Sequence, residues 1–155
     1  RKAFTIIFVA SIIIWFLQSF DFAFNFVEDS STSMLANIGT WISHIFAPLG
    51  FEDWRASTAL VTGITAKESV VSTLSVLTNT TSDAGLSVAL QTIFSPVSAF
   101  AFLCFTVLYM PCVAAFAATK RELGSMKQAL ATVAYQTGVA YVVALLVYQI
   151  GSLLF

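Results

Sequence analysis

The sequence carries little charge for its length. Asp, Glu, Lys and Arg make up 10% of the 155 residues, whereas a soluble domain carries about 25%. Seven basic and eight acidic residues leave a net charge of −1, so no basic surface for a nucleic-acid partner is expected. Hydrophobic residues account for 58% of the chain, and the mean hydropathy is +0.88. This composition predicts an integral membrane protein in contact with the lipid bilayer.

Cysteine, histidine and nucleotide-binding motifs are also scarce. Two cysteines are too few for a disulfide scaffold, and the single histidine, His44, cannot form a metal cluster and is expected to be exposed. The chain lacks Gly-x-Gly-x-x-Gly, a Walker loop, Cys-x-x-Cys, His-Glu-x-x-His and Gly-x-Ser-x-Gly. We therefore predict that this chain is not an enzyme. Because it begins with Arg1 rather than Met, we expect it to be a piece of a longer polypeptide.

Four hydrophobic segments are long enough to cross a bilayer, which takes roughly 20 apolar residues. They cover residues 3–20, 56–78, 98–119 and 128–155. The first follows two basic residues, as a signal peptide would. It is longer than the apolar core of a signal peptide, however, and no Ala-x-Ala cleavage site follows it. The pattern predicts an all-α membrane protein in which residues 1–155 form a single transmembrane domain.

Two further segments connect these hydrophobic stretches. Residues 34–46 carry apolar side chains at helical spacing, which predicts an amphipathic helix lying in the membrane interface or packing over the bundle. The apolar positions are Met34, Leu35, Ile38, Trp41, Ile42, Ile45 and Phe46. Residues 79–96 are polar and nearly uncharged, and they are expected to form a short loop.

The basic residues predict the orientation in the membrane. Arg1, Lys2 and the basic stretch 120–127 are expected on the cytoplasmic side, and the acidic residues of 21–29 on the outer side. Four full crossings cannot satisfy this distribution. It is satisfied if residues 56–78 are a broken or re-entrant element that enters and leaves on the outer side. The alternative is a full crossing with a basic loop outside.

Lys67 and Glu68 lie at the centre of the second hydrophobic segment. A charge at that depth costs about 2.5–3.5 kcal/mol, and such residues often line an ion or proton path. Adjacent residues do not face each other on a helix, so each charge needs another partner or a hydrated cavity. Neighbouring hydroxyl residues such as Ser72 suit either a hydrated cation path or close helix packing. The alternatives are a structural ion pair with another helix, or a loop mistaken for a span.

Met110, Pro111 and Cys112 interrupt the third hydrophobic segment. Pro111 predicts a kink or break that frees the carbonyl of Val107 toward a cavity or another helix. Broken helices near the middle of the bilayer build ion sites in many transporters. The Cys112 thiol and the Met110 thioether suit a soft or borderline transition metal, and Glu68 is a weaker candidate ligand. Packing is the alternative for both sulfur residues, and it is the expected role of Cys104.

Two blocks of the sequence resemble a known family. The first comprises Phe46–Phe51, Asp53–Arg55 and Gly63–Leu74, and the second comprises Leu108–Ala115 with Lys120–Glu122. Both are similar to the C-terminal membrane region of the ferrous iron transport protein B family, including its second gate motif. The similarity runs in order over almost the whole chain.

This resemblance implies a multi-pass transporter of Fe²⁺ in the cytoplasmic (inner) membrane of a bacterium or archaeon. Fe²⁺ would be the transported substrate, with no permanently bound cofactor. The gate cysteine that contacts the metal would be Cys112, while Pro111, Lys67, Glu68 and Ser72 would be gate or structural residues. The resemblance also implies a GTP-binding domain and a first gate half, both missing here, as partners in the same polypeptide, and it is compatible with a homo-oligomer.

The resulting functional prediction is half of a ferrous iron permeation path. Two alternatives stay open at this point. One is a gate-type transporter half for an organic solute such as a nucleoside. The other is a non-transporting membrane interaction module, in which Lys67 and Glu68 only pack.

Overall fold

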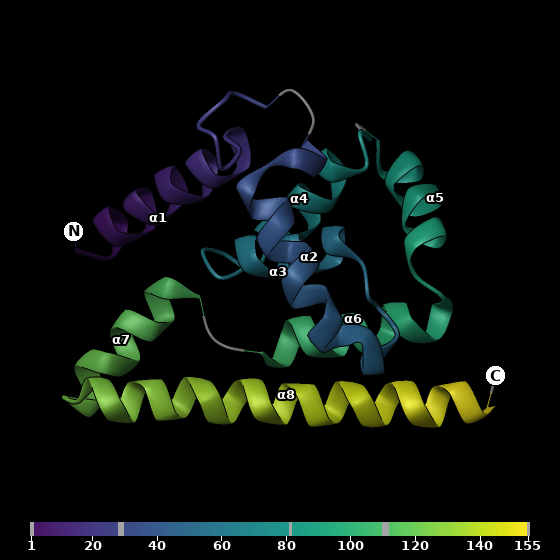
Figure 1. The fold of residues 1–155 in the computed structure, drawn as a ribbon. Helices are drawn as coiled ribbons and strands as arrows, with labels where there is room; N and C mark the ends of the chain where they lie inside the picture. The colour runs from purple at the N-terminus through teal and green to yellow at the C-terminus, as the bar shows by residue number, and fades with distance from the viewer. Residues whose placement is uncertain (1, 28–29, 81, 110–111, 155) are drawn as a thin grey trace.

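The computed structural model describes residues 2–27, 30–80, 82–109 and 112–154, and these residues are helical with no named strand (Figure 1). The predicted all-α class is therefore confirmed. The α-helices are α1 (Lys2–Ser19), α2 (Met34–Phe46), α3 (Trp54–Thr62), α4 (Ser69–Leu77), α5 (Asp83–Ile93), α6 (Pro96–Leu108), α7 (Val113–Leu123) and α8 (Met126–Leu154). Two short 3-10 helices, Ser30–Thr32 and Ala47–Leu49, flank α2.

By length and composition, two stretches are apolar enough to cross a membrane. They are Pro96–Leu123, which contains α6, α7 and residues 110–111 outside the described ranges, and Met126–Leu154, which is α8. Helix α1 contributes a shorter apolar stretch, Phe8–Ser19. Helices α6 and α7 both pack on α8, and the buried Ala140 and Ala144 of α8 lie one turn apart. Small residues at that spacing allow two helix backbones to approach closely.

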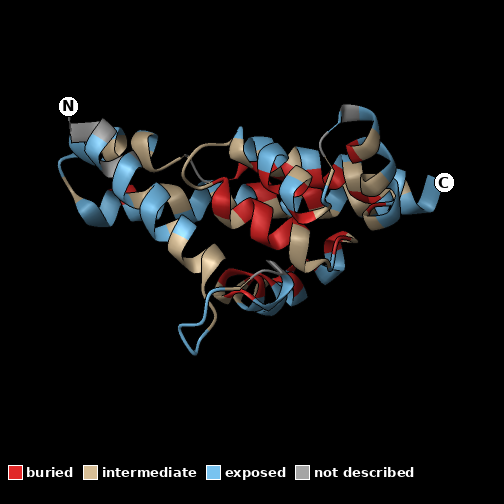
Figure 2. Cartoon of the chain, turned by 90° about the horizontal axis from the view of Figure 1, so that it is seen from above, coloured by how far each residue is buried: buried red, intermediate tan, exposed pale blue. Residues whose placement is uncertain are grey.

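The core lies where α2, α3 and α6 meet the turn after α2. Phe51 is 1% exposed and packs at 5.2 Å against Phe46 and at 5.4 Å against Phe102, measured between ring centroids. Gly50 makes this turn possible, because it adopts a left-handed conformation with φ of 77° and lies against the ring of Tyr148. Figure 2 shows the buried residues gathered in the middle of the molecule, between exposed ends.

The second predicted hydrophobic segment is two short helices in the structure. Helix α3 ends at Thr62 and α4 begins at Ser69, so residues 63–68 form a break in the middle of the segment. The prediction of a loop over residues 79–96 is wrong for α5. The hydroxyl of Ser82 caps this helix by accepting from the amide of Gly85 at 3.2 Å. Leu86 and Phe94 bury against the core, and this packing stabilises a helix whose own apolar pattern is weak.

Helix α2 covers the residues expected for the amphipathic helix and packs over the bundle against α3. Its buried face is formed by Leu35, Ala36, Gly39, Ser43 and Phe46. Trp41, which belongs to the predicted apolar stripe, is 76% exposed. Leu35 and Phe46 of the predicted stripe belong to the buried face, and Gly39 lies so close to α3 that a side chain there would meet Thr58. Close approach therefore selects the small residues of α2 for the interface.

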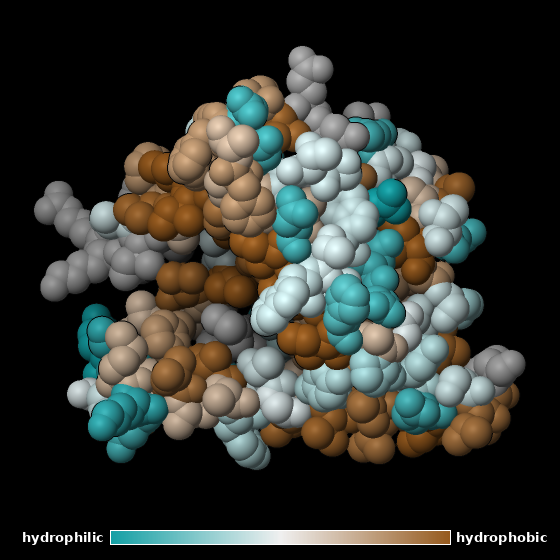
Figure 3. Space-filling view, viewed as in Figure 1, coloured by the Kyte–Doolittle hydropathy of each residue, from teal (hydrophilic) through white to brown (hydrophobic). Residues whose placement is uncertain are grey.

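The helix ends are segregated along the long axis of α8. Helix α1 begins, α7 ends and α8 begins at the same end of the molecule, at the left of Figure 1, while α5 and the end of α8 lie toward the opposite end. Lys120 and Arg121 lie in the last turn of α7 and so belong to the first end. In Figure 3, hydrophobic side chains predominate over the coloured part of α1 and recur along the lower edge formed by α8, whereas the face over α2 between them is largely polar or intermediate.

Candidate functional site

The first element of the site is the break between α3 and α4. The hydroxyl of Thr62 donates to the carbonyl of Ala59 at 2.9 Å, and the hydroxyl of Thr65 donates to the carbonyl of Thr62 at 2.7 Å. Such local bonds compete with helix continuation. Gly63 is buried, and a Cβ there would lie 2.5 Å from both the Tyr109 hydroxyl and Val70. The glycine thus lets α4 and the end of α6 approach the break.

The second element is the break between α6 and α7. Helix α6 ends at Leu108, and the amide of Tyr109 donates to the carbonyl of Phe105 at 2.8 Å. Cys112 has an extended ψ of 160°, precedes α7 as its N-cap residue, and carries a half-buried free thiol. Met110 and Pro111, the other two residues of the predicted motif, lie outside the described residues.

Hydrogen bonds join the two breaks directly. The Lys67 ammonium donates to the carbonyl of Val107 at 2.7 Å and more weakly to that of Tyr109 at 3.4 Å. The amide of Val113, the first residue of α7, donates to the carbonyl of Ile64 at 2.8 Å. Cys112 precedes Val113 in the sequence and Thr65 follows Ile64, so each of them is adjacent to one member of this hydrogen-bonded pair.

Tyr109 adds a third connection between the breaks. Its buried hydroxyl donates to the carbonyl of Leu60 in α3 at 3.1 Å. The Lys67 ammonium lies 5.2 Å from the centroid of the same ring, within the range of a cation–π contact. The same ring stacks on Phe105, with centroids 5.5 Å apart. Tyr109 therefore contacts both Lys67 in the α3–α4 break and the backbone of α3 before this break.

This geometry identifies the partner of one carbonyl and distinguishes two neighbouring charges. The carbonyl of Val107, expected to face a cavity or another helix, accepts a hydrogen bond from Lys67 in the α3–α4 break. Within the described chain Lys67 has no carboxylate partner. Glu68 is exposed and makes no hydrogen bond or ion pair with the residues that the structure describes. A cation at a helix C-terminus is favourable because the last carbonyls there lack helical partners.

A groove of about 260 Å³ lies between α1 and the α3–α4 pair. Thr62 and Thr73 form a buried hydrogen bond of 2.8 Å between their hydroxyls at this groove. Seven of the ten residues that line it carry polar side chains, namely Ser11, Gln18, Thr62, Thr65, Ser69, Ser72 and Thr73, and the other three are Ile14, Trp15 and Val76. The predicted gate residue Ser72 is exposed here. Because Thr65 lies in the break, the groove reaches the segment that is bonded to α7.

Sequence reasoning missed the contribution of α1 to this groove. Ser11 and Gln18 are seven residues apart in a helix that is otherwise nearly all apolar. Residues seven apart share one face of a helix, and polar residues of membrane helices face the bundle or a hydrated cavity. That spacing was the available signal.

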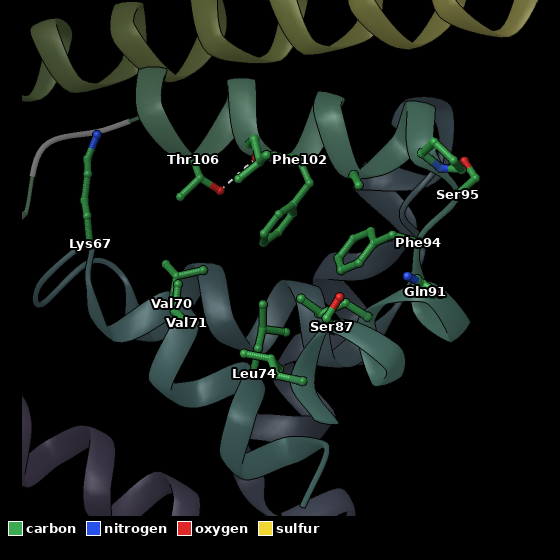
Figure 4. A pocket seen from close by; sticks show the side chains of 15 residues that line it. Lys67, Val70, Val71, Leu74, Ser87, Gln91, Phe94, Ser95, Phe102 and Thr106 are labelled. Atoms are coloured by element: carbon green, nitrogen blue, oxygen red, sulfur yellow. Dashed lines mark hydrogen bonds between the residues drawn. The ribbon is translucent and has the colours of Figure 1, made fainter. Parts of the chain in front are cut away.

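A second, apolar cavity of about 770 Å³ lies between α4, α5 and α6. Val70, Leu74, Phe94 and Phe102 are among its lining residues, and Figure 4 shows Lys67 at one end of it. The ammonium of Lys67 points out of this cavity, since its hydrogen bonds go to the backbone at the end of α6. The cavity therefore does not share the polar chemistry of the groove.

The remaining predicted residues are dispersed. No group of three or more His, Cys, Asp and Glu residues that could hold a metal ion occurs in the described part of the chain. Cys104 is half-buried within α6 and forms no disulfide with Cys112. His44 is exposed and lies 3.7 Å from the carboxylate of Glu52. Cys112 is thus the sulfur donor among the described residues of the two breaks.

Comparison with known proteins places this arrangement in a family. The profile described as "Gate: Nucleoside recognition" matches residues 1–126. The chain belongs to the Gate family. This Gate chain is 43% identical, over its whole length, to the Fe(2+) transporter FeoB of Methanocaldococcus jannaschii. It is 39% identical over 99% of its length to the Fe(2+) transporter FeoB of Staphylococcus aureus. The resemblance expected from the two sequence blocks is confirmed.

The similarity covers only part of each relative. The Gate chain spans 24% of the Methanocaldococcus jannaschii protein and 23% of the Staphylococcus aureus protein. A protein of Porphyromonas gingivalis named as a fusion of Fe(2+) transport protein A and Fe(2+) transporter FeoB is 35% identical over 83% of the chain. No solved structure matches the chain.

Proposed function

We propose that this Gate chain forms half of the path along which Fe²⁺ crosses the cytoplasmic membrane of a bacterium or archaeon. The single observation that carries the proposal is the hydrogen-bonded junction of two broken helices with Cys112 at its edge, in a chain whose relatives are named as Fe(2+) transporters. Broken helices form ion sites in other transporters, and thiolate sulfur suits a borderline cation such as Fe²⁺.

The proposed path uses Cys112 as a transient contact and the hydroxyl groove as the hydrated part of the route. Hydroxyl and amide groups interact with the water shell of an ion without holding the ion tightly. A conducting site must release its ion, so weak donors beside one thiol fit passage better than storage. Met110 and Glu68 stay secondary candidates for contact with the metal. The rest of the polypeptide would supply the other gate half and the GTP-binding domain, and a homo-oligomer is compatible with this scheme.

The proposed topology has α1, α6–α7 and α8 crossing the membrane, while α3–α4 enters and leaves on the outer side. Its support is that the ends of α1 and α7 near Lys2, Lys120 and Arg121 share one end of the molecule. Basic residues near membrane helices favour the cytoplasmic side. In this arrangement the break at residues 63–68 lies within the membrane and faces the break before α7.

The test is Cys112→Ser in the intact transporter, with Cys104→Ser as the matched control. Serine has nearly the size of cysteine but binds a borderline cation more weakly. We expect Cys112→Ser to lower iron uptake about tenfold per folded molecule, and Cys104→Ser to change it less than twofold, since a tenfold change needs only about 1.4 kcal/mol of lost interaction. Unchanged uptake per folded molecule in Cys112→Ser would show that this thiol is not a metal contact.

The description of the family favours a second candidate, the transport of a nucleoside. The two candidates make different predictions for the parent protein. Nucleoside transport requires that a nucleoside be taken up and that excess Fe²⁺ leave its uptake unaffected. An iron path requires the reverse result, and both can be measured in the same vesicles.

A further inference from the structure

Lys67 is the charged residue of the junction for which the proposed iron path has no use. Its ammonium is bonded to the carbonyls of Val107 and Tyr109 and lies over the Tyr109 ring. All three contacts are with the end of α6, about 40 residues farther along the chain. No carboxylate among the described residues neutralises this charge. The partner of the charge is therefore the backbone of another broken helix.

The end of α6 is a place where a cation is stabilised. The last four carbonyls of a helix have no partner within the helix, and the helix dipole gives that end a partial negative charge. In transporters with discontinuous helices, such carbonyl ends coordinate mobile cations. Here the ammonium of Lys67 already donates to the carbonyl of Val107 at 2.7 Å, a short bond typical of a charged donor.

The same contact lies at one end of the segment that carries Cys112. The segment from Val107 to Val113 is short, and it is bonded to the α3–α4 pair at both ends: by Lys67 and the Tyr109 hydroxyl on one side, and by the Val113 amide on the other. Cys112 lies within this span, one residue before Val113. Loss of the ammonium would leave the carbonyl of Val107 without its charged partner, and the bond of the Tyr109 hydroxyl would remain at the start of the span.

We propose that Lys67 is an internal cation that occupies the carbonyl end of α6 and thereby positions Cys112, instead of contacting the transported metal itself. The Val107 and Tyr109 carbonyls are then not part of the ion path, and the metal meets sulfur and hydroxyl groups without them. The positioning is a property of the fold, while its importance for transport rests on the proposed function. Lys67 is accordingly a positioning residue.

The experiment measures the reactivity of Cys112 toward N-ethylmaleimide in the purified full-length transporter without iron. Labelling is quantified by mass spectrometry of the peptides that contain Cys112 and Cys104, so that Cys104 serves as an internal reference. In Lys67→Met we expect Cys112 to react about tenfold faster, because a charged hydrogen bond shifts an opening equilibrium by at least that factor. The rate at Cys104 should stay the same. Lys127→Met, at an exposed position of α8, removes the same charge and should alter neither rate.

Two further variants keep the test decisive. Lys67→Arg retains the charge and should keep the rate at Cys112 within about threefold of the wild type, while Lys67→Gln retains a donor without charge and should lie between Arg and Met. If Lys67→Met is not recovered as folded protein, the comparison of Gln with Arg decides. Equal Cys112 rates in the wild type, Gln and Met proteins, or faster labelling of Cys104 to the same extent, would overturn the proposal.

Iron uptake by the same variants separates this proposal from the iron path. If Lys67→Met exposes Cys112 but Cys112→Ser transports normally, Lys67 positions a thiol that iron does not use, and only the proposed function fails. If Cys112→Ser loses uptake while the labelling rates do not respond to Lys67, the iron path stands and the positioning role fails.

Discussion

The two broken helices of this chain differ in where their backbone groups obtain hydrogen-bond partners. The α3–α4 break satisfies its backbone locally, through the Thr62 and Thr65 hydroxyls and tight turns, and of its two charged residues Lys67 bonds to the other break. The α6–α7 break contributes no charge among its described residues and relies on the first break for partners at Val107, Tyr109 and Val113. The first break is thus largely self-sufficient and the second is dependent. A charged side chain that is costly to place in one membrane helix can supply the hydrogen-bond donor that carbonyls at the end of another helix lack.

The comparison extends to the membrane, where the two broken elements should differ in topology. If α3–α4 is re-entrant and α6–α7 crosses, residues before α6 and after α7 lie on opposite sides. A cysteine replacing Ala84 in α5 should react with an impermeant maleimide added outside intact cells, and a cysteine replacing Glu122 at the end of α7 should react only after permeabilisation. Ala84→Cys that reacts only after permeabilisation would require α3–α4 to cross fully.

Gly63 is a position at which the first break has no room for a side chain. In Gly63→Val the new Cβ would meet the Tyr109 hydroxyl and Val70 at 2.5 Å, and overpacking of this kind costs about 1–3 kcal/mol. We expect a clear loss of thermal stability and of iron uptake. Gly138→Val in α8 is the matched control, because nothing lies within 4 Å of a Cβ there. Equal stability of the two variants would show that the breaks do not need this close approach.

Tyr109→Phe tests the dependence of the second break with a smaller change. The ring stays for Phe105 and Lys67, but the hydrogen bond to the carbonyl of Leu60 is lost, at a cost of about 1 kcal/mol. Cys112 should react with maleimide several-fold faster. The control is Tyr141→Phe, which removes a similar hydroxyl bond, 2.9 Å to the carbonyl of Ile45, at an exposed site away from the breaks. If both variants label alike, the Tyr109 hydroxyl does not hold the second break.

Helix α5 and the buried face of α2 show where sequence reasoning stopped. The segment 79–96 is polar enough to be predicted as a loop. Leu86 and Phe94, however, pack in a core formed mainly by helices that are distant in the sequence. Ser82, three residues before Gly85, was a capping signal that could have indicated the start of α5. For α2, the apolar stripe predicted the helix, but the closeness of α3 determined which side is buried.

The sequence by itself determined the membrane class, the hydrophobic segments and the places where two of them break. Composition, the run length of apolar residues, charges within a hydrophobic segment and the effect of proline are local properties, so they can be read without a fold. Only the tertiary structure decided that Lys67, and not Glu68, bonds to Val107. Lys67 and Val107 are 40 residues apart in the sequence, and Lys67 differs from its neighbour Glu68 in the direction of its side chain. It also decided that Ser11 and Gln18 share a groove with Thr62 and Ser72. Such pairings depend on which surfaces pack together, and that is a property of the whole chain.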